Sequence, residues 1–331
     1  MSLPSVSAVI ATYQRRDLMA RAVRAVAADP YVDEIVVVVD GSPDGSYELL
    51  TEMAADDPRI RPLWRENGGE AAARQSGVEE ATGDIVLLLD DDVIAGPGLS
   101  RAHAAVHACT GGGGGDAPGV VVLGYMPTRR PAVRRPGGFT TDLYADEYEA
   151  RCRRYESDPS TVLRNCWAGN VSIRRADALR VGLRGGGPRL AYHSDQEFGL
   201  RCLRAGLTGV FDRGLVAEHH HERDLDTFLR QARNAAADRV ALERLFPDLI
   251  PPGGLRDTLP LPVRAAVAAT AAPGLCRVAV PVLRWSIRLA GRLRLWRLES
   301  ALGRYLRQVE LHRGYRQPAL AGMTGAAGAA G

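Results

Sequence analysis

The sequence predicts an α/β fold, a doubly wound and mainly parallel sheet followed by a helical C-terminal extension. Over the first hundred residues, apolar runs of strand length alternate with segments that have helical spacing. The run EIVVVVD at 34–40 is apolar almost throughout, which is typical of a parallel strand covered on both faces. From Leu225 onward helical patterns dominate, and this change of pattern predicts the helical extension.

The expected elements follow one another in a βαβ rhythm. In the first part of the chain we expect strands at 6–11, 34–40, 60–64 and 84–90, and helices at 17–28, from the turn at 41–46 to Asp57, and at 70–80. After Asp92 the rhythm loosens, and the further expected elements are strands at 119–126, 167–175 and 209–212 and a helix at 193–206.

The composition limits which classes of protein and which binding partners we expect. The formal net charge of +3 is too small to indicate a nucleic-acid partner. Five cysteines show no metal-ligand spacing, which predicts reduced thiols in a cytoplasmic protein. The chain starts directly into a strand pattern and has no uncharged apolar run of about 18 residues, so we expect neither a secretory signal nor a spanning helix.

The candidate chemistry lies where apolar runs end, because ligands of an open α/β sheet sit at the carboxyl ends of its strands. Thr12, Asp40 and the cluster Asp90-Asp91-Asp92 directly follow such runs. Adjacent carboxylates repel one another unless a cation neutralises them, and Mg²⁺ or Mn²⁺ with phosphate oxygens suits such a cluster. The alternative is an acidic turn that caps the next helix.

Three other positions each allow a structural interpretation as well as a functional one. Asp40 either accepts hydrogen bonds from a base or ribose or simply begins a turn. Arg74 follows a glycine turn and is either an anion ligand or an exposed helical arginine. The run at 219–221, three histidines after an apolar stretch, is either a metal ligand or a polar surface turn.

Seven motifs in order resemble the inverting family 2 glycosyltransferases with the GT-A fold, over residues 5 to 235. They are IATYQRRDL, VVVVDGSPDGS, NGGEAAARQSG, LLLDDDV, WAGNVSIRR, HSDQEFGLR and AEHHHERDLDTFLRQARNAA. The resemblance implies a catalytic domain at 1–225, with a nucleotide-sugar half at 1–95 and an acceptor half at 96–225. A helical region at 226–321 and a disordered tail at 322–331 would follow.

The resemblance also implies the residues that bind the sugar donor. Asp40 would bind the base or ribose, Arg74 would support the acidic turn and the diphosphate, and Asp90 would face the ribose. Asp92 would hold the Mg²⁺ or Mn²⁺ that bridges the phosphates. His219, with His221 second, would complete the metal coordination or touch the diphosphate, and which of His219, His220 and His221 contacts the metal stays open. The remaining donor-binding residues would be Ala11, Thr12, Arg15 and Asp91.

On the acceptor side, the resemblance makes Asp195 the general base that takes the proton of the acceptor hydroxyl. Glu197 and Arg201 would order its helix and loop, and Trp167, Gly169 and Asn170 would lie on the acceptor-side strand. The sequence departs from the family pattern at Gln14, at Val39 and at Ser194. The change at Ser194 alters the position before Asp195, where the family has glutamate, and leaves Asp195 in place.

The implied reaction is a single displacement at the anomeric carbon of a UDP-, dTDP- or GDP-sugar, with inversion. The acceptor is a glycan, a lipid-linked molecule or a natural product. A nucleotidyltransferase would need a glycine-rich phosphate loop after the first strand, which IATYQRRD lacks. A non-catalytic nucleotide-sugar-binding scaffold is the other alternative, and the presence of Asp92 and Asp195 disfavours it.

The segment 256–317 carries twelve arginines against three acidic residues, a formal balance of +9. Three interpretations stay open. The first is packing on the catalytic domain through Leu283, Ile287, Leu293, Leu298 and Leu302. The second is peripheral contact with the inner face of the membrane, with Trp285 and Trp296 at the interface. The third is a homodimer.

Overall fold

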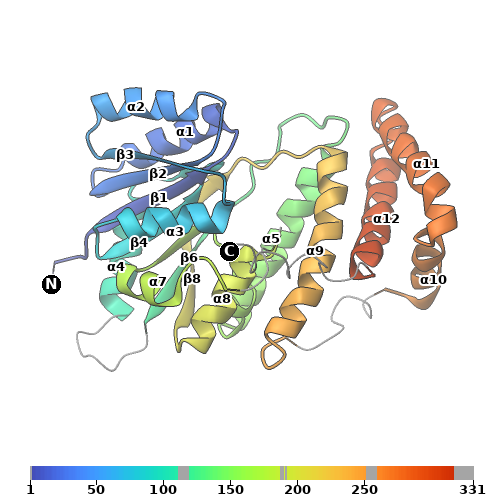
Figure 1. The fold of residues 1–331 in the computed structure, drawn as a ribbon. Helices are drawn as coiled ribbons and strands as arrows, with labels where there is room; N and C mark the ends of the chain where they lie inside the picture. The colour runs from blue at the N-terminus through green and yellow to red at the C-terminus, as the bar shows by residue number, and fades with distance from the viewer. Residues whose placement is uncertain (1, 111–118, 187–189, 191, 251–258, 317–331) are drawn as a thin grey trace, which may run out of the picture. The chain divides into compact units, whose positions relative to one another are not determined.

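The computed structural model describes residues 2–110, 119–186, 190, 192–250 and 259–316, and the predicted tail at 322–331 lies outside them. The chain divides into two compact units whose segments alternate along the sequence (Figure 1). The first unit comprises 1–129, 145–185 and 195–221, and the second comprises 130–144, 186–194 and 222–331. The division at 225 that the sequence suggests stays a prediction.

An eight-stranded mixed sheet with the strand order β3-β2-β1-β4-β7-β6-β8-β5 forms the first unit. The strands β1 to β4 run parallel, β7 is antiparallel to β4 and β6, and β8 is parallel to β6. In chain order the strands are Val6–Thr12, Glu34–Asp40, Ile60–Arg65, Ile85–Asp90, Val93–Ala95, Val120–Tyr125, Asn170–Arg174 and Thr208–His219, for β1 to β8.

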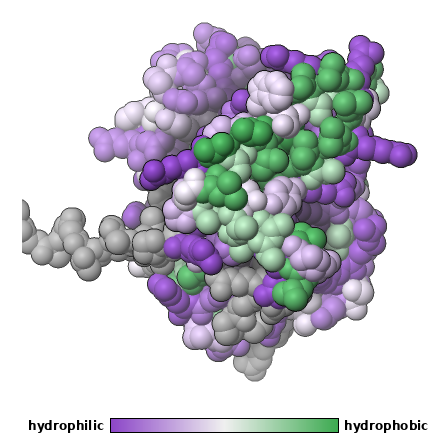
Figure 2. Space-filling view, turned by 90° about the vertical axis from the view of Figure 1, so that its right-hand side faces the viewer, coloured by the Kyte–Doolittle hydropathy of each residue, from purple (hydrophilic) through white to green (hydrophobic). Residues whose placement is uncertain are grey.

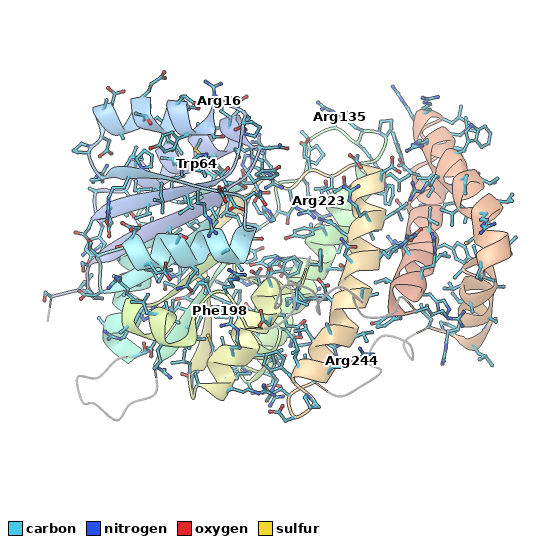
Figure 3. All side chains as sticks on the ribbon, in the orientation of Figure 1. Arg16, Trp64, Arg135, Phe198, Arg223 and Arg244 are labelled. Atoms are coloured by element: carbon cyan, nitrogen blue, oxygen red, sulfur yellow. The ribbon has the colours of Figure 1, made fainter. Side chains whose placement is uncertain are left out.

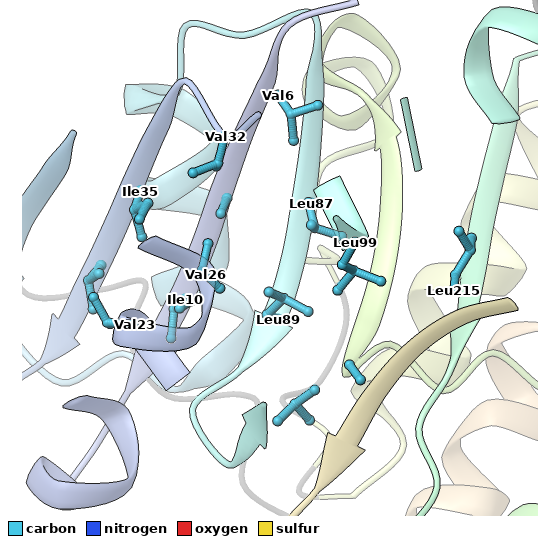
Figure 4. Packing of buried hydrophobic residues seen from close by; sticks show 14 of the residues in the cluster. Val6, Ile10, Val23, Val26, Val32, Ile35, Leu87, Leu89, Leu99 and Leu215 are labelled. Carbon is cyan, nitrogen blue, oxygen red and sulfur yellow. The ribbon is translucent and has the colours of Figure 1, made fainter. Parts of the chain in front are cut away.

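Helices cover both faces of this sheet, and the apolar strands alternate their side chains between two cores. Along β2, Ile35 and Val37 belong to one core and Val36 and Val38 to the other. Figure 4 shows part of the first core, with Leu87 and Leu89 of β4 among its members. The helices are α1 Arg16–Ala27, α2 Ser46–Asp56, α3 Glu70–Glu80, α4 Leu99–Thr110, α5 Phe139–Ser157, α6 Thr161–Arg164, α7 Arg175–Val181 and α8 Ser194–Arg204.

Two of these helices pack on the second core in different ways. Gly77 on α3 lets that helix approach the sheet, because a Cβ there would lie 2.4 Å from Val9 Cγ1 and 3.1 Å from Val38 Cγ2. Phe198 of α8, labelled in Figure 3, is buried in the same core. Both helices begin near the strand ends that carry the candidate site, where Arg74 of α3 contacts Asp195 of α8, so this packing fixes where their polar residues lie.

The amino ends of the parallel strands are held by one buried carboxylate, that of Glu34. Glu34 Oε1 accepts hydrogen bonds from the Ser7 hydroxyl at 2.6 Å, the Thr82 hydroxyl at 2.8 Å and the Thr82 backbone N–H, and Oε2 pairs with Arg61. Although burial opposes the charge, these donors lower the pKa of Glu34 from 4.5 to about 2. The ionised side chain therefore stabilises the folded sheet at neutral pH.

The second unit is helical and has a core of its own. Its helices are α9 Leu225–Leu245, α10 Leu261–Thr270, α11 Pro273–Arg292 and α12 Trp296–Tyr315, together with the first residues of α5. Phe139 lies at the centre of the core and meets the ring of Phe228 edge-on at 5.9 Å. Gly303 of α12 allows this contact, because a Cβ there would lie 2.2 Å from the Phe139 ring.

Of the side chains named for packing on the catalytic domain, Leu293 and Leu298 are instead 60% and 48% exposed. Ile287 is buried, and Leu283 and Leu302 pack against the core of the second unit. Packing of these three on the catalytic domain stays a prediction. Among the described residues no single helix is long and apolar enough to span a membrane; α10 and α11 meet that criterion only as a pair, bent by 97°.

The sheet, the helices that cover it and the helical extension confirm the predicted fold class. β3 ends at Arg65, one residue beyond the prediction, and α3 has the predicted bounds. The last strand was predicted too short, at 209–212, since β8 continues to His219. The three-residue strand β5 was not predicted at all.

Candidate active site

Polar side chains of the first unit meet at the carboxyl ends of β1 and β4. The two strands are parallel neighbours, and Ala11 of β1 lies opposite Asp90, the last residue of β4. Asp91 and Asp92 form the turn into β5, and the N-terminal end of α8 brings Asp195 to the same place. The structure therefore brings together the carboxylates that the sequence predicted.

Arg15 joins Asp91 and Asp92. Its Nη1 lies 2.8 Å from Asp91 Oδ1 and 2.8 Å from Asp92 Oδ2, and the Thr12 hydroxyl donates to Asp91 Oδ2 at 2.8 Å. Burial raises the pKa of Asp91 to about 6 despite the charge of Arg15. Burial also opposes the charge of Asp92, but the hydrogen bond from His219 and the charges around it hold the pKa of Asp92 well below its usual range.

Arg74 joins the strand end to α8. This buried arginine donates from Nη1 to Asp195 Oδ1 at 2.9 Å and from Nη2 to Asp90 Oδ1 and to the Ala168 carbonyl. It also pairs with Glu70, one helical turn earlier on α3, at 2.8 Å. The arginine thus contacts the carboxylates of Asp90 and Asp195, and no contact of it with the acidic turn at 40–46 is found among the described residues.

Asp195 is held by both of its carboxylate oxygens. Oδ1 accepts from Arg74, and Oδ2 accepts from the Ala168 backbone N–H at 3.0 Å, while the side chain stays 22% exposed. Each carboxylate oxygen has a second lone pair, so a held carboxylate of this kind still has capacity to accept a proton.

The rest of α8 is tied to the loop after α7. Glu197 pairs with Arg201 at 3.2 Å across one helical turn. Arg201 donates to the carbonyls of Val181 at 2.9 Å, of Leu183 at 3.0 Å and of Gly182. The two residues therefore fix the helix and this loop.

The histidines reach the carboxylates through the short strand β5. Val93 of β5 pairs with His219 of β8, and this pairing brings His219 Nε2 to 3.2 Å from Asp92 Oδ1. His221 is also buried, with its ring 5.1 Å from that of His219. His220 points elsewhere, with Nε2 2.7 Å from Glu218 and Nδ1 3.1 Å from Arg21.

The predicted acceptor-side residues occupy three different environments. Trp167 meets the Tyr148 ring edge-on at 5.4 Å, and the Arg151 guanidinium lies 4.9 Å from the centre of the Trp167 ring. Gly169 makes room for Asp90, because a Cβ there would lie 2.6 Å from Asp90 Oδ2.

Asn170 is fully buried. Its side chain contacts His103 Nε2 at 3.0 Å and the Leu215 carbonyl at 3.0 Å. This position supports the sheet and does not fit contact with an acceptor. His103 also lies 2.8 Å from the hydroxyl of Ser172, which completes a buried polar group beneath β7.

Asp40, the last residue of β2, organises the turn before α3. Its Oδ1 accepts from the Gly68 N–H at 2.9 Å and its Oδ2 from the Gly69 N–H at 2.7 Å, while Asn67 donates to its carbonyl. Arg65 Nε is 3.4 Å from Oδ1. The carboxylate thus fixes the glycine turn, and its contact with a base or ribose stays a prediction.

The sequence reasoning missed two members of this region. Glu70 had a signal, its spacing of four residues from Arg74 on a predicted helix. His103 had none, because a lone histidine in a helix shows neither its burial nor its partners across the sheet.

Comparison with known proteins matches part of this chain to a family. The sequence profile described as Glycosyl transferase family 2 matches residues 7–111, which include β1 to β5 and the Asp90–Asp92 cluster. Residues 7–111 therefore match glycosyltransferase family 2. The resemblance stated from the motifs is therefore confirmed.

Curated relatives of this chain carry glycosyltransferase names. Validoxylamine A glucosyltransferase of Streptomyces hygroscopicus subsp. limoneus is 30% identical over 288 residues, which cover 75% of this chain and 58% of the relative. Glucosyl-dolichyl phosphate glucuronosyltransferase of Haloferax volcanii is 27% identical over 181 residues, covering 54% of this chain and 55% of the relative. The chain thus spans less than two thirds of the length of these curated relatives.

The solved structures agree on the fold. The mannosyltransferase PcManGT from Pyrobaculum calidifontis, solved with GDP-Man and Mn²⁺, superposes with a TM-score of 0.61 at 20% identity, covering 96% of this chain and 89% of that one. The chain therefore has the GT-A fold with added C-terminal helices.

Proposed function

We propose that this chain transfers a sugar from a nucleoside diphosphate sugar to an acceptor hydroxyl, with a divalent cation and with inversion at the anomeric carbon. The observation that carries the proposal is the gathering of Asp90, Asp91, Asp92 and Asp195 around Arg15 and Arg74 at the carboxyl ends of β1 and β4. The family match over residues 7–111 and the names of the relatives support the reaction class.

The residues present fit a divalent cation shared with a diphosphate. Asp92 Oδ1 and His219 Nε2 lie 3.2 Å apart, which is compatible with two neighbouring ligands of one octahedral cation, about 3 Å apart. Among the described residues no group of three or more His, Cys, Asp or Glu side chains is arranged to hold a metal. Mg²⁺ and Mn²⁺ commonly take one or two protein ligands and complete their coordination with phosphate oxygens and water, so Asp92 with His219 is a sufficient protein ligand set.

Different side chains would then bind the cation, the diphosphate and the nucleoside of the donor. Asp92 with His219 would hold the cation, with His221 packed behind it. When bound, the cation supplies charge stabilisation for the leaving nucleoside diphosphate. Arg15, exposed over 41% of its side chain, would turn toward the diphosphate, while Ala11, Thr12 and Asp90 would line the nucleoside side.

Asp195 would act on the acceptor. It is partly exposed, and its position is fixed by Arg74 and the Ala168 N–H, so it can accept a proton from a hydroxyl without first being ordered. Arg74 links this base to Asp90 on the donor side, which couples the positions of the two substrates. In-line attack on the face opposite the leaving group gives inversion.

The nucleoside and sugar can be found by a binding screen. We expect UDP-, dTDP- or GDP-sugars to raise the melting temperature only with Mn²⁺ or Mg²⁺, since ligand at 100 times its Kd adds about 2.7 kcal/mol. Asp92→Asn should lose this cation-dependent rise, and Asp17→Asn, at a carboxylate exposed over 92% of its side chain, should keep it. Full stabilisation in excess chelator would refute the cation proposal.

The products then identify the reaction class. A glycosyltransferase releases nucleoside diphosphate from a sugar nucleotide, whereas a nucleotidyltransferase running in reverse consumes pyrophosphate and releases a nucleoside triphosphate. A non-catalytic scaffold binds the donor and releases nothing. Mass spectrometry of the reaction mixture separates these outcomes, and only the first supports the proposal.

A further inference from the structure

A stripe of apolar side chains faces solvent along α11. The residues that define this apolar stripe recur every three or four positions, which places them on one side of the helix. They are Leu275, Val278, Val282 and Trp285, exposed by 52%, 66%, 55% and 63%.

The apolar stripe is distinct from the face that α11 uses for folding. Val280 and Ile287 are buried in the core of the second unit, and Leu283 packs against them. The helix therefore has two apolar sides, and only one of them is used within the described structure. Burying a large apolar side chain contributes about 1.5–3 kcal/mol, so leaving four exposed in one row calls for an external partner.

The stripe continues into neighbouring segments of the same unit. Leu261 at the start of α10 is 76% exposed, and Leu293 and Leu295 after α11 are 60% and 49% exposed. Figure 2 shows hydrophobic side chains gathered in a broad band on one face of the molecule, with hydrophilic side chains at its borders. This is a larger apolar surface than singly scattered residues produce.

The charge of the segment that carries the stripe is mostly positive, although Asp226 of α9 pairs with two arginines of α11, Arg284 at 3.0 Å and Arg288 at 2.6 Å. Between 261 and 316 the sequence has eleven arginines against Glu299 and Glu310, a formal balance of +9. Both glutamates are buried, at 1% exposure: Glu299 accepts from the Gly137 N–H and Glu310 pairs with Arg233 and Arg313. Because both carboxylates of the described part of this segment are buried, the formal charge that it exposes to solvent is carried by its arginines.

We propose that the apolar stripe and its arginines dock on the surface of an anionic phospholipid bilayer. An apolar row with a tryptophan suits the boundary between headgroups and acyl chains, and flanking arginines suit the phosphates above it. The helix lies in the interface rather than across the bilayer. The four arginines along α11 and the 97° bend between α10 and α11 both oppose a spanning position.

Charge complementarity selects this occupant over the others. A second copy of the chain in a two-fold dimer would place the same arginines against one another around the stripe. A nucleic acid would match the charge but would leave the apolar row against phosphates and water. An anionic bilayer satisfies both features with one surface.

The test uses the full chain and vesicles of phosphatidylcholine with or without phosphatidylglycerol, at low and high salt. We expect co-sedimentation with the anionic vesicles at low salt, weakened by salt, together with a blue shift of tryptophan emission. Val278→Ser combined with Trp285→Ser should weaken binding at least about tenfold. Arg277→Gln combined with Arg292→Gln should weaken it about thirtyfold, about fivefold for each arginine.

Matched variants separate docking from general adhesion. Arg24→Gln with Arg101→Gln removes the same charge from exposed positions of the first unit and should leave binding within about threefold of wild type. Trp285→Phe should keep binding and lose the emission shift, whereas Trp64→Phe, at a tryptophan that is 51% exposed on β3, should keep both.

Several results would overturn the proposal. They are absence of binding to anionic vesicles at low salt, wild-type binding by the double serine variant, and an equal loss in the first-unit arginine variant. Sedimentation equilibrium adds a fourth: a dimer that the double serine variant dissociates, without vesicle binding, would assign the stripe to a second copy. Donor binding is measured separately and is expected to be unchanged in all stripe variants.

Discussion

Replacing Asp195 by asparagine tests the proposed base and has a structural cost that can be derived from its contacts. The wild-type carboxylate offers one oxygen to Arg74 at 2.9 Å and the other to the Ala168 N–H at 3.0 Å. Asparagine has a single acceptor oxygen, so its NH₂ group must face one of these two donors. Keeping the contact with Arg74 leaves the Ala168 N–H without an acceptor.

The expected magnitudes follow from that geometry. One unsatisfied donor of this kind costs about 1–3 kcal/mol, which lowers the melting temperature by about 2–10 °C. Loss of the base should lower kcat by about 10² or more. The dissociation constant of the nucleotide sugar should stay within about twofold, because Arg15 and Asp92 are untouched.

A matched control separates the two effects. Asp29 is a buried aspartate of the same unit whose two oxygens accept from the Tyr31 and Ser100 N–H groups, both at 3.0 Å. Asp29→Asn should therefore lower the melting temperature by a similar amount and leave turnover intact. Turnover is followed as release of nucleoside diphosphate, with water or an identified acceptor. Wild-type kcat in Asp195→Asn, or an equal loss in Asp29→Asn, would refute the assignment of the base.

Two further predictions concern packing and pH. Gly169→Ala would place a Cβ 2.6 Å from Asp90 Oδ2, so we expect a loss of about 1–3 kcal/mol in unfolding free energy and weaker donor binding; Gly186→Ala, with open space around it, should show neither. Glu34→Gln should cost about 3 kcal/mol at pH 7, because the pKa of Glu34 is lowered from 4.5 to about 2. That stability is present above pH 4.5 and is lost as the pH falls toward 2, so urea unfolding curves of wild type and Glu34→Gln should converge in acid; a difference that persists at pH 2 would contradict the linkage.

The parallel half of the sheet could be predicted because its signals are local. Strands that are buried on both faces appear in the sequence as continuous apolar runs. The bounds predicted for β1 to β4 therefore agree with the structure to within about one residue. The end of β8 could not be predicted, since Asp212, Arg213 and Gly214 interrupt its apolar pattern. The pairing register between β6 and β8 shifts at these residues: Gly124 of β6 pairs with Asp212, and the next residue, Tyr125, pairs with Val216.

The members of the site could be predicted better than their contacts. Asp90 to Asp92 were found because carboxylates at strand ends are visible in the sequence. The pairing of Arg74 with Asp195 spans 121 positions and depends on how α3 and α8 pack against the sheet. The same limit applies to Asn170. The sequence motif predicts that Asn170 lies in a strand. Which face of the sheet its side chain is buried on, and whether it contacts His103 there, depend on how the sheet and α4 pack.

The charges of the site bear on how its two ligands would bind. Among the described residues, Asp90, Asp91, Asp92, Asp195 and Glu70 pair with the guanidinium groups of Arg15 and Arg74, so the cluster retains net negative charge when all five carboxylates are ionised. The raised pKa of Asp91, about 6, is the expected consequence of burying that excess. A divalent cation would neutralise it, and the diphosphate would then bring the negative charge that frees Arg15 from the aspartates. On this reasoning the cation and the nucleotide sugar should bind cooperatively, each removing the electrostatic cost of the other.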